Sequence, residues 1–154
     1  MGRLLVIALL LMISGGLIAQ DAQFRGPGRS GIFPDTALLE EWPEDGPEIL
    51  FVVDDLGKAW SSAVVAGEKI FVTGLKDSTE YLFALNLEGE LLWKVPYGRA
   101  WNKSFPEPRC TPTVDGDRLY VLTGMDVLSC LSTVDGKEIW KVDIHERHLK
   151  QSSC

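Results

Sequence analysis

Residues 88–95 read Glu-Gly-Glu-Leu-Leu-Trp-Lys-Val, and residues 135–142 read Asp-Gly-Lys-Glu-Ile-Trp-Lys-Val. In each stretch an acidic residue and a glycine precede a short run of apolar residues that includes a tryptophan. The two tryptophans, Trp93 and Trp140, lie 47 residues apart. An acidic residue followed by glycine favours a tight turn, and the run that follows is typical of a strand, so both stretches predict a hairpin turn leading into a strand.

A second pair of segments repeats just before these stretches. Residues 61–72 and 110–121 each hold two strand-like runs separated by a turn, and the turn glycines, Gly67 and Gly116, lie 49 residues apart. Glycine and tryptophan therefore recur together at nearly one period. A period of about 40–50 residues built from strand signals is typical of a β-propeller blade.

The sequence predicts an all-β fold: a partial β-propeller of about two four-stranded antiparallel blades plus one strand, preceded by a signal-peptide helix. The additional strand is expected over Ile49–Val53. β-branched and aromatic residues mark four strands in the first copy, at Ser62–Val65, Ile70–Thr73, Tyr81–Leu85 and Leu91–Val95. The expected organisation is a signal peptide (1–19), an N-terminal arm with a partial first blade strand (20–58), a blade (59–98), a loop and second blade (99–144), and a frayed or truncated tail (145–154).

The N-terminus has the layout of a secretory signal peptide. Arg3 supplies a positive charge, an apolar run follows over Leu4–Ile13, and Ala19 is the best candidate for the last residue removed. The alternative is a transmembrane anchor, because the uncharged stretch over residues 4–20 is about as long as the shortest bilayer spans. We expect an exported protein, periplasmic or secreted, with no stable membrane span after the signal is removed.

Composition excludes several classes of protein. The 154 residues are 45% apolar, which is enough to form a core and excludes a disordered chain. The formal charge of −7 argues against nucleic acid as a partner and against a polybasic membrane surface. Cys110, Cys130 and Cys154 form no Cys-x-x-Cys pair, so no zinc module or dense disulfide framework is expected. An oxidising compartment would permit a bridge between Cys110 and Cys130, but two small buried thiols are the preferred interpretation.

The two tryptophan stretches resemble the tryptophan-docking motif of the pyrroloquinoline-quinone-like (PQQ-like) β-propeller family, with Gly89, Trp93, Gly136 and Trp140 as the repeat residues. The resemblance implies that the tryptophan of one blade packs against the hairpin of the next blade. Phe51 stands where a preceding blade would offer that tryptophan. The resemblance covers roughly residues 22–144 and extends to Gln23–Pro27, Trp42–Pro43 and Pro108–Pro112.

The resemblance also implies an incomplete ring, since the family closes about seven or eight blades and this sequence holds about two. An uncovered blade face would forfeit on the order of 8 kcal/mol of apolar burial as an upper bound, against a domain stability of about 5–15 kcal/mol. We therefore expect the remaining propeller blades or a protein partner to cover these faces. Residues 145–154 are interpreted as the end of a truncated chain.

The longest irregular connection, residues 97–109, joins the two blades and is the best candidate for a site. Tryptophan and arginine are enriched at binding hot spots, so Arg99, Trp101 and Arg109 are the candidate ligand or partner contacts. The alternative is that Trp101 and Phe105 only fold this loop onto the blade edge.

The resemblance leaves two functions open. The leading hypothesis is a non-catalytic, exported binding or scaffold module, because no catalytic, cofactor-binding or metal-binding residue can be assigned; His145 and His148 lie in a tail without apolar support. The alternative is the N-terminal part of a PQQ-dependent quinoprotein alcohol or sugar dehydrogenase, which would bind PQQ and Ca²⁺. Alcohol-oxidising relatives carry two adjacent cysteines against the cofactor, and no two cysteines are adjacent here. No cofactor is therefore predicted outside that alternative.

Overall fold

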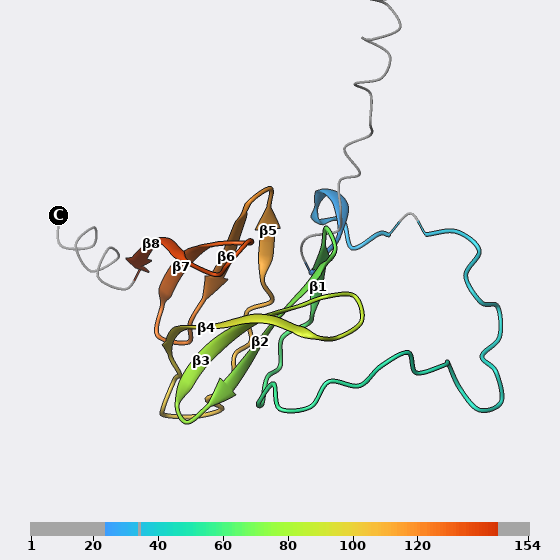
Figure 1. The fold of residues 1–154 in the computed structure, drawn as a ribbon, viewed down its shortest axis with the longest axis horizontal. Coiled ribbons are helices and arrows are strands. Elements are labelled where there is room, and N and C mark those ends of the chain that lie inside the picture. Colours follow the sequence, from blue (N-terminus) through green and yellow to red (C-terminus); the bar gives the residue numbers. More distant parts are fainter. Residues whose placement is uncertain (1–23, 34, 145–154) are drawn as a thin grey trace, which may run out of the picture.

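A computed structural model describes residues 24–33 and 35–144, so the expected signal peptide and tail lie outside the described residues. Eight strands form two sheets, and a single 3-10 turn precedes them (Figure 1). The elements are η1 (Pro27–Arg29), β1 (Val64–Ala66), β2 (Lys69–Lys76), β3 (Thr79–Leu85), β4 (Leu91–Arg99), β5 (Thr113–Asp115), β6 (Arg118–Leu122), β7 (Val127–Ser132) and β8 (Glu138–Asp143).

Each sheet is a four-stranded antiparallel meander, with strand orders β1-β2-β3-β4 and β5-β6-β7-β8. This confirms the two predicted blades. Strands β2 and β4 run further than predicted, because antiparallel pairing continues through Lys76↔Thr79 and Thr79↔Arg99. No helix among the described residues is long and apolar enough to cross a membrane.

The first hairpin of each blade turns at a glycine. Gly67 and Gly116 have φ angles of 62° and 60°, a region that glycine enters without steric cost. A Cβ at either position would meet no atom within 4 Å. At these two turns, glycine is therefore required by the backbone angle alone.

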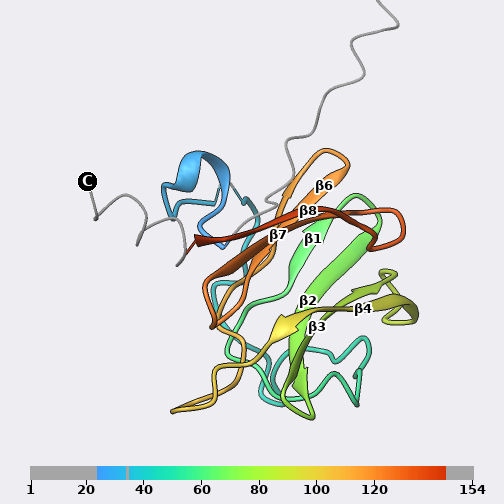
Figure 2. The ribbon, with the colours of Figure 1, turned by 90° about the vertical axis from the view of Figure 1, so that its left-hand side faces the viewer.

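The core lies between the two facing sheets (Figure 2). Alternation along the strands points one set of side chains from each sheet toward the other. The buried cluster consists of Phe71, Leu82, Ala84 and Tyr97 from the first blade and Leu119, Val121 and Leu131 from the second, with Ala66, Trp93, Val95 and Val114 packed against it. The blades therefore stack face to face, as neighbours in a propeller do.

Equivalent residues of the two blades meet where the chain enters the first strand of each. The Ser62 N–H donates a hydrogen bond to Thr111 Oγ1 at 3.0 Å, and these two residues lie 49 positions apart, the spacing of the turn glycines. Two residues earlier, the Trp60 N–H donates to the Pro108 carbonyl at 2.9 Å. The first bond thus joins matching positions of the two repeats, and the second joins positions one residue out of register.

The contact of Trp93 and Val95 with Gly136, here called the inter-blade joint, fastens β4 of the first blade to the β7–β8 turn of the second. A Cβ at Gly136 would lie 2.9 Å from the Trp93 ring and 2.9 Å from the Val95 side chain. The Trp93 ring also packs on Phe71, with 5.8 Å between ring centroids. This confirms that the tryptophan of one blade packs against the hairpin of the next.

Phe51 makes the matching contact one blade earlier. A Cβ at Gly89 would lie 2.6 Å from the Phe51 ring and 3.0 Å from the Val53 side chain. Phe51 and Val53 have the same two-residue spacing as Trp93 and Val95. An aromatic residue and a valine therefore press on a turn glycine at both hairpins.

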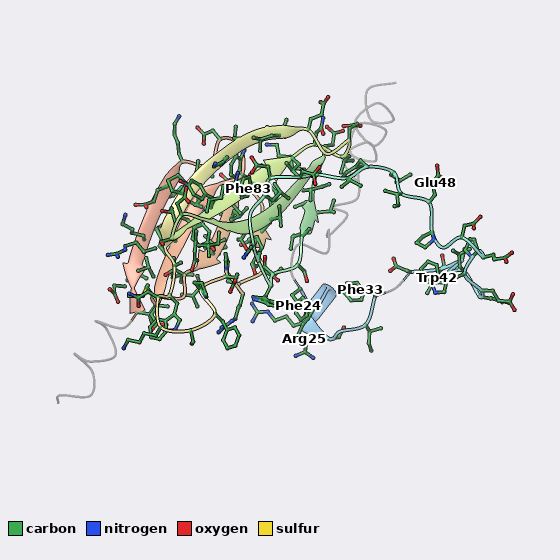
Figure 3. All side chains as sticks on the ribbon, turned by 90° about the horizontal axis from the view of Figure 1, so that it is seen from below. Phe24, Arg25, Phe33, Trp42, Glu48 and Phe83 are labelled. Carbon is green, nitrogen blue, oxygen red and sulfur yellow. The ribbon has the colours of Figure 1, made fainter. Side chains whose placement is uncertain are left out.

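The predicted strand over Ile49–Val53 is wrong. No described strand lies alongside these residues to pair with their backbone, so they stay irregular. The arm runs out from the sheets and returns at an isolated bridge between Lys58 and Leu75 (Figures 1 and 3). Apart from the contact of Phe51 and Val53 with Gly89, many of its apolar side chains remain exposed to solvent, with Trp42 72% and Leu50 82% exposed.

The second blade also buries one of the cysteines. Cys110 and Cys130 are both free thiols, with Cys130 buried and Cys110 half-buried. The preferred interpretation, two small buried thiols, holds for Cys130, whereas Cys110 is only half-buried.

Candidate functional site

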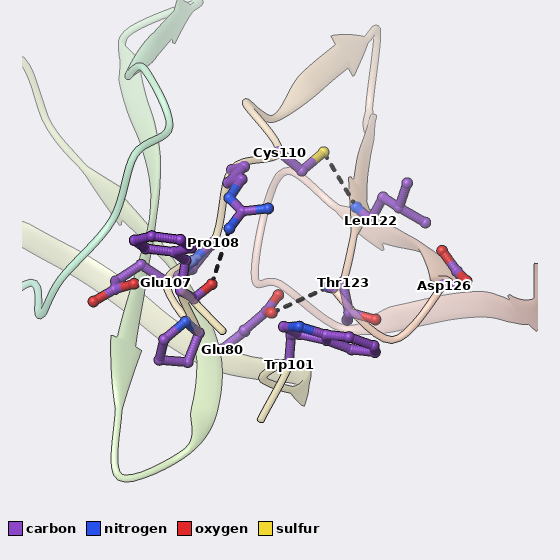
Figure 4. A pocket seen from close by; sticks show the side chains of 12 residues that line it. Glu80, Trp101, Glu107, Pro108, Cys110, Leu122, Thr123 and Asp126 are labelled. Carbon is purple, nitrogen blue, oxygen red and sulfur yellow. Dashed lines mark hydrogen bonds between the residues drawn. The ribbon is translucent and has the colours of Figure 1, made fainter. Parts of the chain in front are cut away.

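A pocket of about 650 Å³, here called the inter-blade pocket, opens between the two blades beside the connection from β4 to β5 (Figure 4). The connection lines it with aromatic, proline and charged side chains, and the turn between β6 and β7 forms the facing wall. The residues that the following argument uses are Glu80 from β3, Trp101, Phe105, Glu107, Arg109 and Cys110 from the connection, and Gly124 and Asp126 from the turn.

Local contacts order the connection. The Trp101 indole Nε1 donates a hydrogen bond to Ser104 Oγ at 3.3 Å, and the Lys103 ammonium lies 5.4 Å from the centre of the Trp101 ring. Arg109 donates to the Phe105 carbonyl at 3.2 Å, and its guanidinium lies 5.8 Å from the Phe105 ring. Arg109 is therefore engaged by the loop to which it belongs.

Glu80 is the buried acid of the inter-blade pocket, with only 1% of its surface exposed. Its Oε1 accepts a hydrogen bond from the Gly124 N–H at 3.2 Å, which links β3 to the second blade (Figure 4). Its Oε2 is buried, and the Tyr97 hydroxyl is the group that interacts with this carboxylate, although the two form no well-aligned hydrogen bond. One carboxylate oxygen is thus held by a backbone N–H, whereas the other is only weakly satisfied.

Burial governs ionisation around this acid. Burial raises the pKa of Glu80, although interactions with the Tyr97 side chain and the Gly124 N–H act in the opposite direction. Burial, followed by the nearby Glu80 carboxylate, raises the pKa of Tyr97. Burial also raises the pKa of the Cys110 thiol. Tyr97 and Cys110 therefore stay neutral near pH 7 and add no further negative charge beside Glu80.

We expect Glu80→Gln to stabilise the protein at neutral pH by about 1–3 kcal/mol, because it removes a negative charge that burial disfavours and keeps the shape of the side chain. Because the folded pKa of Glu80 is raised, the folded state holds the Glu80 proton more tightly than the unfolded state does. Wild-type stability is then fully present below the usual pKa, near 4.5, and falls as pH rises through the folded pKa. In thermal melts the gain should be small at about pH 4 and largest above about pH 7.

The control is Glu48→Gln, the same change at an exposed position of the arm (Figure 3). It should leave the melting temperature unchanged at both pH values. If the difference in melting temperature between Glu80→Gln and wild type is the same at both pH values, the change does not come from burial of the ionised Glu80 carboxylate.

Comparison with known families explains the repeat. Residues 78–151 match the family model described as outer membrane protein assembly factor BamB. The match begins in the β2–β3 turn and includes both glycine–tryptophan stretches. This part of the chain is similar to a family of PQQ-like β-propeller proteins. No curated protein matches the sequence.

Two solved structures are similar to part of this propeller chain. BamB from Moraxella catarrhalis is 19% identical with a TM-score of 0.47, over 58% of this chain and 26% of that one. A europium-containing methanol dehydrogenase is 18% identical with a TM-score of 0.46, over 60% of this chain and 17% of that one. The chain therefore spans 26% and 17% of the lengths of these two proteins.

The structure brings two of the three predicted contact residues to the pocket. Trp101 and Arg109 line it, whereas Arg99 lies exposed at the end of β4, outside the lining. Phe105 is 69% exposed, so this ring is not folded away onto the blade edge. Contact with a ligand or partner stays a prediction for all three predicted residues.

Trp140, the last residue of the predicted repeat motif, occupies in β8 the position that Trp93 occupies in β4. It packs on Tyr120, with 6.0 Å between ring centroids, and it remains 39% exposed. Within the described ranges, no turn glycine lies against Trp140 as Gly136 lies against Trp93. The outer face of the second blade therefore presents an exposed copy of the joint residue.

Sequence reasoning missed Glu80, the most deeply buried acid of the site. A signal was present, because side chains two and four residues apart in a strand share a face. Glu80 shares its face with Leu82 and Ala84, which are both fully buried. An acidic residue on the same strand face as two core residues indicates either a paired charge or a binding site.

The inter-blade pocket does not fit PQQ. This quinone carries three carboxylate groups, and the pocket would set three more against them, from Glu80, Glu107 and Asp126. The only cationic side chain in the lining is Arg109, which is already engaged by Phe105. Facing like charges oppose binding, so a PQQ site would need other residues. In residues 24–33 and 35–144, no three His, Cys, Asp or Glu side chains gather to hold a metal ion.

Proposed function

We propose that the chain is part of an exported PQQ-like propeller that serves as a non-catalytic binding or scaffold module. The observation that carries the proposal is the inter-blade pocket, where Trp101 and the exposed Phe105 stand beside a buried acid. Loops on a rigid sheet framework are the usual place for a binding site. The matched family model is described as an assembly factor, which favours a protein as the partner.

A second contact surface follows from the outer face of the second blade. Trp140 is partly exposed there, and large aromatic side chains are favoured anchors at protein interfaces. In the proposed assembly, the remaining propeller blades or a protein partner cover this face. The pocket and this face would then serve different contacts.

The binding role predicts a specific adduct at the pocket. A photo-crosslinking amino acid placed at Trp101, in the producing organism, is expected to capture one discrete protein partner in an exported fraction. The same probe at Val134, which is 69% exposed in the β7–β8 turn, is the control and should capture none. Equal labelling from both positions, or a chain retained inside the cell, would contradict the proposal.

The rival dehydrogenase role predicts a different result. The purified full-length protein should then bind PQQ with Ca²⁺ saturably and reduce an artificial electron-accepting dye when given an alcohol or a sugar. Under the binding role, we expect neither saturable binding nor dye reduction. Dye reduction above the rate of free PQQ would overturn the non-catalytic assignment.

A further inference from the structure

We propose that the outer faces of the two blades bind each other between copies of this chain, so that a second copy supplies the next blade. The tail face is the outer side of the second blade, with Tyr120, Trp140 and Val142. The head face is the outer side of the first blade, with Ile70, Leu85 and the Gly89 turn. This inference rests on the proposed scaffold role and names the occupant of the face that Trp140 marks.

The tail face repeats the surface that the first blade uses to bind the second. In the first blade, Phe71 and Trp93 pair with the same residue of β3 and pack in the core between the blades. In the second blade, Tyr120 and Trp140 pair with the same residue of β7 in the same way. The two ring pairs also match, with 5.8 Å and 6.0 Å between centroids and tilts of 46° and 51°. The second blade therefore presents on its outer side a surface shaped to bind another blade.

The head face repeats the surface that receives a neighbouring blade. Leu119 and Leu131 pair across β6 and β7 and form part of the second blade's side of the core. Ile70, which lies 49 residues before Leu119, pairs in the same way with Leu85 across β2 and β3. Successive residues of a strand point to opposite faces, so Ile70 lies on the opposite face from the core residue Phe71. The first blade therefore carries the receiving surface on its outer side.

Part of the arm occupies the head face. Phe51 lies against Gly89 as Trp93 lies against Gly136. Phe51 lies outside the described strands and remains 40% exposed. A tryptophan carried on a four-stranded sheet buries more apolar surface against this turn than Phe51 does. Trp140 of a second copy would therefore displace Phe51 from the turn.

The polar rim of the interface between the blades is also repeated. The Lys69 ammonium donates a hydrogen bond to the Thr133 carbonyl at 2.9 Å, which links the start of β2 to the β7–β8 turn of the second blade. Arg118 is exposed, lies 49 positions after Lys69 and begins β6, the counterpart of β2. By the same relation, Arg118 would donate to a carbonyl of the β3–β4 turn in a second copy. The contact between copies thus has a polar rim as well as an apolar centre.

The two faces lie on opposite sides of the stacked blades, so one chain carries both halves of the contact (Figure 2). Unlike faces that bind each other make a head-to-tail contact, which closes into a ring when the rotation between units allows it. A β-propeller closes with about 4–8 blades, so a ring of two-blade chains holds about two to four copies. The contact therefore continues the interface between the blades from one chain to the next.

Sedimentation velocity of the purified protein tests this contact. As the concentration rises, we expect a discrete assembly of about two to four copies. Trp140→Ala should weaken association by at least about tenfold, the usual effect of truncating an aromatic anchor. Trp42→Ala, which removes a 72% exposed tryptophan from the arm, should leave association unchanged.

Circular dichroism, at a concentration where the copies are apart, confirms that Trp140→Ala is folded. A protein that stays monomeric at every concentration would overturn the proposal. Equal effects of Trp140→Ala and Trp42→Ala on association would overturn it as well.

Phe51→Ala tests the competition between the arm and a second copy. Phe51 lies on the turn that Trp140 would enter, so its removal raises the fraction of chains whose head face is open. We expect association to tighten by at least about threefold, because apparent affinity rises with the fraction of binding-competent chains. Leu50→Ala, at the adjacent 82% exposed position, is the control and should have no effect. Unchanged or weaker association of Phe51→Ala would overturn the proposal that a second copy enters this turn.

A photo-crosslinking amino acid at Arg118 identifies the partner of the tail face. In a mixture of isotope-labelled and unlabelled copies, we expect adducts between copies that map to the β3–β4 turn. The same probe at Glu48, exposed in the arm, should give no such adduct. Adducts to position 118 of a second copy would indicate a symmetric contact, and adducts to a different protein would indicate another occupant, so either result would overturn the proposal. The probe at Trp101 tests the proposed function independently, because it reports on the inter-blade pocket.

Discussion

Trp93→Ala is expected to lower the free energy of unfolding by about 3–5 kcal/mol, the usual cost of removing a large aromatic side chain from a packed interface. Trp93 contacts Phe71 in its own blade and closes the inter-blade joint against Gly136. Its removal would leave a cavity at the boundary between the two sheets. Chemical denaturation followed by circular dichroism measures the loss.

Trp140→Ala is the matched control for this change. It removes the same side chain from the equivalent position of the next blade, where the ring is 39% exposed and packs on Tyr120. We expect a loss of only about 1 kcal/mol, because less apolar surface is uncovered. Equal losses of unfolding free energy for the two variants would show that the inter-blade joint adds no stability beyond that of a partly exposed tryptophan.

Gly136→Ala is expected to cost about 2–5 kcal/mol. The φ angle of 70° is unfavourable for any residue with a Cβ, at about 1–2 kcal/mol. The new methyl group would also lie 2.9 Å from both the Trp93 ring and Val95, and overpacking adds roughly 1–3 kcal/mol. Thermal unfolding should shift downward accordingly.

Gly116→Ala separates the two contributions. Its φ angle of 60° carries the same backbone penalty, but a Cβ there meets no atom within 4 Å, so we expect a loss of about 1–2 kcal/mol. In the double variant Trp93→Ala/Gly136→Ala, the steric conflict is partly relieved. The loss of unfolding free energy in the double variant should therefore be smaller than the sum of the losses in the two single variants. Strict additivity would contradict direct contact between ring and turn.

The blades were predictable because their signal is repeated and local. Gly67 and Gly116 mark turns through a backbone angle that glycine adopts freely, and Trp93 and Trp140 recur at nearly the same spacing. Each of these residues acts within a hairpin or between neighbouring repeats, so short-range pattern and period were enough. The ends of strands were harder to predict. Strand β2 extends to Lys76 because β3 pairs with it there, and not because its last residues favour a strand.

The arm and the pocket depend on contacts that the sequence does not display. The Ile49–Val53 segment has the composition of a strand, but a strand also needs a neighbour, and no described strand supplies one. Glu80 meets Gly124 across 44 positions, which differs from the 47- and 49-residue spacings of the repeat residues. The place of Trp101 and Arg109 in the pocket was predictable because both lie in the loop between the blades, where binding residues are common. Arg99 instead lies at the end of strand β4 and outside the pocket.

The hydrogen bond between Ser62 and Thr111 has a consequence for how such proteins can change in size. Because it connects equivalent positions of neighbouring units, an in-frame tandem duplication of one unit would recreate it on both sides of the inserted copy. The same holds for the pairing of a β4-type aromatic residue with the next turn glycine. Unequal recombination between repeats can therefore add or delete a whole unit without requiring a new contact surface to evolve.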